Sequence, residues 1–184
     1  TATLAPGDAI GNYIATKTRL LREMGIRVRL YADFVDPAYP ERVQHSRWYL
    51  STGKSILWYH YSIYSPNVEI ARASADFKVM DYHGVSPPEL FAGWNDDLAN
   101  ICRIGLERLP ALAEAFERYV VHSEYTRGAL VDAGFAAERI CKLPLCVDLN
   151  RLKPLTHGEL VEHLEKMRYL IFVGRIVPQK DIKR

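Results

Sequence analysis

The sequence predicts an α/β fold in which a parallel sheet carries helices on both faces. Short apolar runs alternate along the chain with segments whose apolar residues recur at helical spacing. Several of these runs are apolar at consecutive positions, which is typical of strands that are buried on both faces of a parallel sheet. The composition of the 184 residues, 48% hydrophobic and 25% charged, provides an ordinary core and excludes a disordered chain.

Strands are predicted where β-branched and aromatic residues lie between turn residues. These segments are residues 3–5, 27–32, 56–60, 77–83, 119–122, 140–143 and 169–173. The second segment alternates Val28 and Leu30 with arginines, and the third and fourth end in His60 and His83. The polar residues 33–54 separate the second strand from the third and are predicted to be a loop with a short helix.

Helical spacing of apolar residues predicts the intervening helices. They are residues 9–24, 67–73, 87–91, 98–116, 126–133 and 158–166. Asp8 is a suitable N-cap for the first of these helices, and Gly25 a suitable C-cap. Pro110 predicts a break within residues 98–116. Gly134 is expected to end the helix at 126–133.

Composition and spacing also exclude several classes of protein. No apolar stretch is long enough to span a membrane, residues 1–7 carry no secretory signal, and a net charge of +2 is too small to indicate nucleic acid. Cys102, Cys141 and Cys146 form no disulfide framework, which favours a reducing, cytoplasmic location. No histidine pair has the i, i+4 spacing of zinc helices, so no metal is expected. No bound cofactor is expected either.

Polar residues gather where the predicted strands end. The segments are residues 6–11, 60–62, 81–84 and 123–124. Because ligands bind beyond the carboxyl ends of strands in open parallel sheets, we expect these segments to meet at one edge. Ser123 and Glu124 are expected mainly to cap the following helix, and Glu89 to have a structural role.

A basic segment follows the last predicted strand. Arg175 and Lys180 lie on the turn after residues 169–173. An arginine fork and a lysine point charge suit a diphosphate group.

The motif Gly174-Arg175-x-x-Pro178-x-Lys180 resembles the start of the C-terminal domain in retaining glycosyltransferases of family 4, which have the GT-B fold. Further segments resemble elements of this family in the same order along the chain. They are residues 7–11, 20–28, 59–63, 82–91, 121–127 and 143–148. Cys146 and Asp181 stand where the family usually has glycine.

The resemblance implies a Rossmann-like, acceptor-side domain over residues 1–152 and an interdomain helix over 153–168. Residues 169–184 would be the first strand and phosphate loop of a donor-binding domain that is otherwise absent. The expected activity is metal-independent transfer of a sugar, with retention, from a nucleotide-sugar to a glycan or lipid-linked acceptor, in bacterial polysaccharide or cell-envelope glycan synthesis. Because the family's donor-binding glutamates are absent, the chain is expected to be an inactive fragment of a hexosyltransferase.

The resemblance also assigns roles to individual residues. His83 would lie at the catalytic centre and orient the transferred sugar. The donor-binding residues would be Gly7, Gly11, Arg175 and Lys180, and the acceptor-binding residues Asp8, His60 and Tyr61. For Asp8, capping of the first helix is an equal alternative.

Several alternatives stay open. A nucleotide-sugar epimerase with a GT-B-like architecture and a non-catalytic Rossmann-like binding module would have similar patterns. Arginines among the apolar residues of 98–116 fit either a core helix with a solvated face or peripheral contact with the inner face of a membrane. The apolar segment 169–173, without a sheet of its own, is expected to pair with another chain or with its own domain.

Overall fold

The computed structural model describes residues 1–146, 159–164, 167–171 and 173. The chain divides into two compact units, Thr1–Cys146 and Val147–Arg184. The boundary predicted at residue 152 lies outside the described residues, as do Arg175 and Lys180.

A four-stranded parallel sheet forms the centre of the first unit and confirms the predicted Rossmann-like α/β class. Its strands are β5 (Ile56–Tyr61), β6 (Phe77–Tyr82), β7 (Arg118–Val121) and β8 (Ile140–Lys142), in that spatial order. His60 on β5 pairs in register with Asp81 on β6, which in turn pairs with Val120 on β7. The carboxyl ends of these strands therefore meet at one edge, as the sequence predicted.

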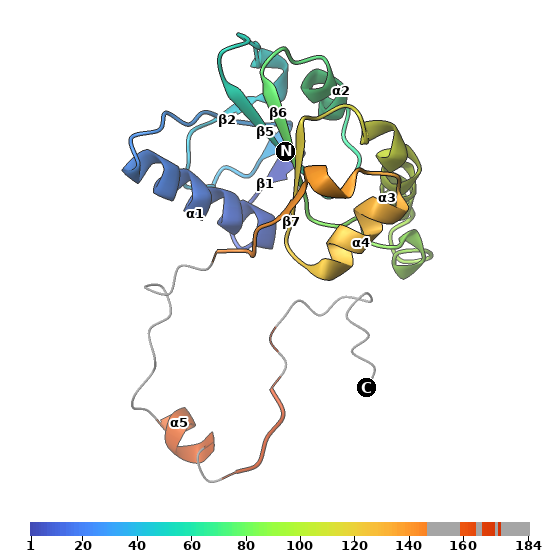
Figure 1. The fold of residues 1–184 in the computed structure, drawn as a ribbon. Coiled ribbons are helices and arrows are strands. Elements are labelled where there is room, and N and C mark those ends of the chain that lie inside the picture. The colour runs from blue at the N-terminus through green and yellow to red at the C-terminus, as the bar shows by residue number, and fades with distance from the viewer. Residues whose placement is uncertain (147–158, 165–166, 172, 174–184) are drawn as a thin grey trace. The chain divides into compact units, whose positions relative to one another are not determined.

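Helices cover both faces of this sheet (Figure 1). On one face lies α1 (Ala9–Glu23), and on the other lie α2 (Asn67–Arg72), α3 (Asp96–Arg108) and α4 (Glu124–Asp132). The predicted break near Pro110 is confirmed, because α3 ends at Arg108 and a 3-10 helix, η3 (Leu109–Leu112), follows. Shorter 3-10 helices are η1 (Ser46–Trp48), η2 (Pro88–Leu90) and η4 (Ala137–Arg139).

Two pairs of very short parallel strands lie at the N-terminal end of the unit. Here β1 (Thr3–Leu4) pairs with β3 (Phe34–Val35), and β2 (Leu30–Ala32) pairs with β4 (Val43–His45). The prediction of a loop with a short helix at 33–54 was therefore incomplete, since η1 lies there together with β3 and β4. The predicted strand 27–32 begins only at Leu30, because β4 offers three residues for pairing.

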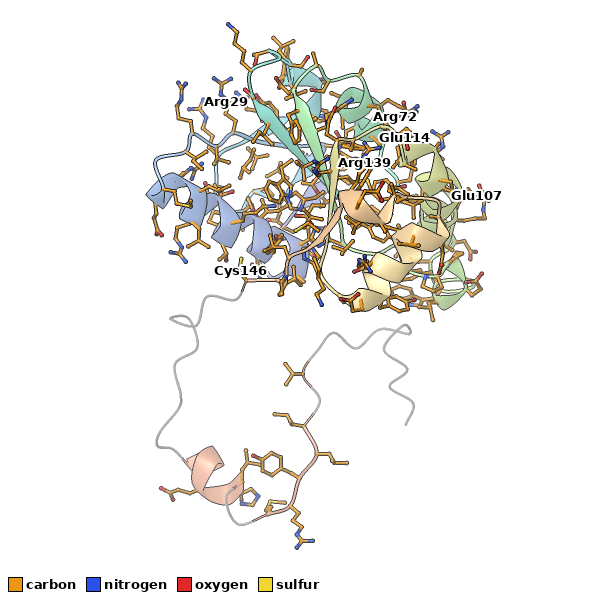
Figure 2. All side chains as sticks on the ribbon, viewed as in Figure 1. Arg29, Arg72, Glu107, Glu114, Arg139 and Cys146 are labelled. Atoms are coloured by element: carbon orange, nitrogen blue, oxygen red, sulfur yellow. The ribbon has the colours of Figure 1, made fainter. Side chains whose placement is uncertain are left out.

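The main core lies on the face of the sheet toward α2, α3 and α4. The sheet contributes alternate residues of β5, β6 and β7 to it: Tyr59, Tyr61, Met80, Tyr82, Tyr119 and Val121. A smaller core joins α1 to the short strands through Leu4, Ile14, Ala32 and Tyr39. At the far edge, Arg139 before β8 donates a hydrogen bond to Glu114 at 2.8 Å, and both side chains are labelled in Figure 2.

In the second unit, α5 (Glu159–Leu164) lies within the predicted helix 158–166. Residues 169–171 and 173 were predicted to be a strand, but none of these four described residues is in one. Leu170, Ile171 and Val173 are exposed. A strand is stabilised by hydrogen bonds to a neighbouring strand, and no partner is paired with these residues in the described part of the unit.

The helices of the described residues are too short or too polar to cross a bilayer. The first of them, α1, has 15 residues and carries several charged side chains. No helix in the described ranges combines the length and the apolar character that a membrane span needs.

Candidate functional site

Asp81, at the end of β6, is the centre of a buried polar cluster. Its carboxylate is fully inaccessible to solvent and lies on the face of the sheet toward α1, opposite the aromatic core. Five other residues of the cluster are His60, His83, His122, Lys17 and Trp58. A buried carboxylate is costly unless charged or hydrogen-bonding partners surround it, and these side chains supply such partners.

Lys17 and Trp58 both contact Oδ2 of Asp81. The Lys17 ammonium lies 3.1 Å from this oxygen, and the Trp58 indole Nε1 donates to it at 2.7 Å. Lys17 also stacks over the Trp58 ring, with 4.0 Å between Nζ and the ring centroid. Helix α1 thus delivers a cation to a carboxylate on the sheet.

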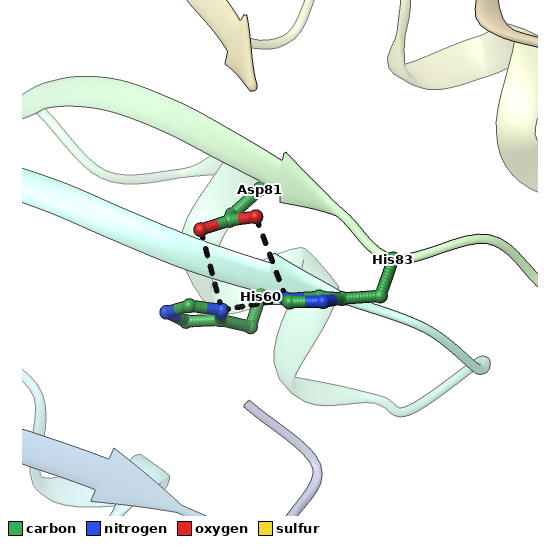
Figure 3. Close-up of side chains that lie close together, drawn as sticks. All are labelled: His60, Asp81 and His83. Atoms are coloured by element: carbon green, nitrogen blue, oxygen red, sulfur yellow. Dashed lines mark hydrogen bonds and ion pairs between the residues drawn. The ribbon is translucent and has the colours of Figure 1, made fainter. Parts of the chain in front are cut away.

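His60 and His83 come from neighbouring strands and contact each other directly. The His60 Nδ1 atom lies 2.9 Å from Nε2 of His83, and the rings are stacked with 5.2 Å between their centroids. Each ring also faces one oxygen of Asp81, at 3.5 Å for His60 and 3.4 Å for His83. Figure 3 shows the carboxylate beside the two imidazoles with one oxygen directed at each ring, and both contacts and the His60–His83 bond are drawn.

His122, just after β7, contacts the second carboxylate oxygen. Its Nε2 lies 2.8 Å from Asp81 Oδ1, and its Nδ1 lies 2.8 Å from the carbonyl oxygen of Leu143. Because both ring nitrogens face acceptors, the doubly protonated imidazolium suits this position best. Burial lowers the pKa of His122, but the contacts with Asp81 and Leu143 outweigh burial and raise it overall.

The other pKa values divide this cluster into charged and neutral groups. Burial raises the pKa of Asp81, but His122, His60 and Lys17 outweigh it and hold the pKa well below its usual range. Burial lowers the pKa of Lys17 to about 8, against the opposing effect of Asp81. Burial also lowers the pKa of His83 to about 4 and that of His60 further below its usual value, so both rings are neutral at pH 7.

Three buried polar atoms in or beside the cluster lack an aligned hydrogen bond. They are the Tyr13 hydroxyl, Asp81 Oδ1 and His122 Nε2, and the latter two face each other as an ion pair without hydrogen-bond alignment. The Tyr13 ring on α1 packs edge-on against His60, His83 and His122. Native proteins keep few such atoms, and among the described residues all of them lie in this one place.

His60, Asp81 and His83 also have the ligand types of a metal site. One ligand atom from each lies within 4.8 Å of the others. No sequence pattern indicated this group, because the histidines come from separate strands and not from one helix. In this arrangement, however, Lys17 and the His60–His83 hydrogen bond already engage nitrogens and oxygens that a metal would need.

The N-terminal turn lies at the same edge of the sheet. Asp8 caps α1, since its Oδ2 accepts a hydrogen bond from the backbone N–H of Gly11 at 3.0 Å. Gly7 has a positive φ of 77°, and a Cβ on Gly11 would lie 2.6 Å from the carbonyl oxygen of Ala5. The turn therefore needs glycine at both positions for local reasons.

The structure does not bring Tyr61 to this site. Side chains alternate along a strand, so Tyr61 faces the opposite side from His60 and packs into the main core. Its hydroxyl donates to the carbonyl oxygen of Gly105 at 2.7 Å. An acceptor-binding role for Tyr61 therefore has no support in the geometry.

Ser123 has the capping role that the sequence predicted. Its side chain accepts from the N–H of Thr126 in a capping box at the start of α4. Glu124 follows in the first turn and pairs with Lys142 at 2.6 Å.

A cavity of about 460 Å³ lies beside the cluster. Lys17, Trp58 and His60 are among its lining residues, together with apolar residues such as Leu30 and Ile56. A ligand in this cavity could therefore contact His60.

The sequence indicated His60, His83 and the segment 81–84. It did not indicate the roles of His122, Lys17, Tyr13 and Trp58. Lys17 and Tyr13 lie on a helix, and the sequence does not show which sheet residues they face. Comparisons with protein-family models, with curated proteins and with solved structures found no match.

Proposed function

We propose that this chain supplies the acceptor-side domain of a retaining glycosyltransferase that uses a nucleotide-sugar donor and a glycan or lipid-linked acceptor. The observation that carries the proposal is the position of His83. This histidine follows β6 at the carboxyl edge of a parallel sheet, where ligands bind in folds of this class.

The surroundings of His83 support the same function. Tyr13 lies two residues after Gly11 on α1 and packs against His83, so the N-terminal end of α1 is close to the cluster. Backbone N–H groups at a helix N-terminus favour phosphate and other anions. His83 would orient the transferred sugar, and His60 would contribute to the acceptor side from the wall of the cavity.

The donor side rests on the family resemblance alone. Arg175 and Lys180 would neutralise the diphosphate as the nucleotide leaves, which is an electrostatic role that needs no metal. The polysaccharide or cell-envelope setting rests on the same resemblance.

A binding experiment tests the proposal directly. The 184-residue chain is titrated with UDP-glucose, GDP-mannose and a polyprenyl-diphosphate-linked monosaccharide, and binding is followed by saturation-transfer NMR. We expect at least one of these probes to bind, and His83→Gln to weaken the binding by about fivefold to tenfold through loss of one hydrogen bond. His163→Gln, a histidine in the second unit, is the matched control and should change nothing.

The outcomes separate the candidate functions. In a full-length protein that also has the donor-binding domain, acceptor-dependent release of nucleotide supports a transferase. Interconversion of the nucleotide-sugar without an acceptor would indicate an epimerase. Binding that is identical in the wild type and in His83→Gln would contradict the proposed site.

A further inference from the structure

Three side chains form a continuous line of nitrogen atoms from α1 to the end of β6. Lys17 Nζ lies 3.0 Å from His60 Nε2, and His60 Nδ1 lies 2.9 Å from His83 Nε2. All three side chains are at most 14% exposed, so water does not readily replace either contact. The ammonium group of Lys17 determines which atom donates and which accepts in each of these two contacts.

Lys17 determines the direction at the first contact. An ammonium group has three N–H donors and no acceptor. The pairing of Lys17 with the fully buried carboxylate of Asp81, at 3.1 Å, requires the ammonium form. His60 Nε2 must therefore accept, and the proton of the neutral His60 ring lies on Nδ1.

The second contact follows from the first. The Nδ1 proton of His60 has its nearest acceptor in Nε2 of His83 at 2.9 Å, whereas Asp81 Oδ2 is 3.5 Å away. His83 Nε2 therefore accepts, and the proton of the neutral His83 ring lies on Nδ1. The reverse order would place an N–H of His60 against an N–H of Lys17.

We propose that Lys17 is a positioning residue that fixes the tautomer of His83 through His60, so that His83 presents its Nδ1 N–H as a hydrogen-bond donor. No described residue accepts a hydrogen bond from this atom, and the atom is not among the fully buried ones that lack a partner. His83 thus offers a donor to an oxygen of the ligand and no lone pair with which to take a proton from it. The identity of that ligand as a nucleotide-sugar rests on the proposed function, whereas the tautomer does not.

The test is a direct measurement of where the ring protons lie. The full chain is labelled with ¹⁵N in its histidine rings, and ring signals are assigned with His60→Gln and His83→Gln. At pH 7 we expect protonated Nδ1 and unprotonated Nε2 in both residues of the wild type. A proton on Nε2 of His83 in the wild type overturns the proposal without any variant.

Variants of Lys17 test the cause. In Lys17→Met the donor to His60 is lost, so we expect the single tautomer of His83 to be replaced by a mixture. Lys17→Arg keeps a donor-only cation and should retain the wild-type tautomer. Lys54→Met, which removes an exposed lysine, is the matched control. An unchanged His83 spectrum in folded Lys17→Met would overturn the proposal.

Two further measurements complete the test. The first shows whether Lys17 or a bound metal sets the tautomers, and the second separates the tautomer proposal from the proposed function. A change in the His60 and His83 signals on treatment with EDTA, reversed by Zn²⁺, would show that a metal and not Lys17 sets the tautomers. Failure of every nucleotide-sugar to bind would count against the proposed function while the measured tautomers still supported the role of Lys17.

Discussion

The two faces of β5, β6 and β7 are built from alternate residues of the same strands, yet they differ completely in chemistry. One face presents tyrosines, Met80 and Val121 to the helices α2, α3 and α4. The other presents the cluster around Asp81 to α1. Apolar burial stabilises the first face, whereas the second keeps several ionisable groups out of water, which stability alone does not require. Such concentrations of perturbed ionisable groups are typical of functional sites.

Removing the carboxylate of Asp81 from the polar face should cause the largest loss of stability. Asp81→Ala leaves the Lys17 ammonium and the His122 imidazolium without their buried counter-charge. We expect a loss of about 3–5 kcal/mol in the free energy of unfolding, measured by chemical denaturation. The exposed Asp132→Ala should stay near the wild type, and a loss of equal size there would show that the effect is not specific to the cluster.

Met80, which precedes Asp81 on β6 and faces the aromatic core, should give the second-largest loss of stability. Met80 is fully buried in the aromatic core, so Met80→Ala leaves a cavity and should cost about 2–5 kcal/mol. We expect the His60 and His83 NMR signals to keep their wild-type tautomers in this variant, because the side chain points away from them. Met24→Ala, at an exposed methionine, is the control for denaturation. Altered tautomers in Met80→Ala would show that the two faces are coupled.

The third effect concerns Asp76 and is lost in acid. Hydrogen bonds from Tyr49, Thr52 and Ser55 outweigh burial and lower the pKa of this carboxyl from 3.8 to about 2. A lowered pKa in the folded state contributes stability above pH 4, and this contribution is lost as the pH falls from about 4 through about 2. Asp76→Asn should therefore be less stable than the wild type at pH 7, with the difference shrinking over this range in urea denaturation. A difference independent of pH would contradict this origin.

The smallest loss of stability is expected for Tyr61, which follows His60 on β5 but faces the main core. Tyr61→Phe removes the hydrogen bond to Gly105 and should cost about 1 kcal/mol in stability. Binding of the nucleotide-sugar or acceptor probes should not change, since the hydroxyl lies in the core. Weaker binding in Tyr61→Phe at full folding would restore the acceptor role that its sequence position suggested.

The sequence predicted the central sheet well because its strands are apolar runs bounded by turn residues. The runs at 56–60, 77–83 and 119–122 agree with β5, β6 and β7 to within one residue at each end. By contrast, β3 and β4 have two or three residues each, and pairing over so short a distance leaves no pattern in the sequence.

The site was only partly predictable for a different reason. Strand ends of a parallel sheet meet at one edge, so His60 and the segment 81–84 could be expected to lie together. Alternation along β5 already distinguishes Tyr61 from His60, and that signal could have excluded Tyr61. The contact of Lys17 with Asp81 depends on how α1 is rotated over the sheet, which is a result of tertiary packing.

The bond from Trp58 to Asp81 gives the site an optical reporter of its own. The chain has three tryptophans, of which Trp48 and Trp94 are 64% and 54% exposed and open to quenching by iodide. Trp58 is shielded by comparison, with its indole N–H on a carboxylate and an ammonium over its ring. The fluorescence that iodide does not quench should therefore come mainly from Trp58, whose indole lies in the electric field of Lys17 and Asp81. A ligand that disturbs Lys17 or Asp81 should shift the wavelength of this emission.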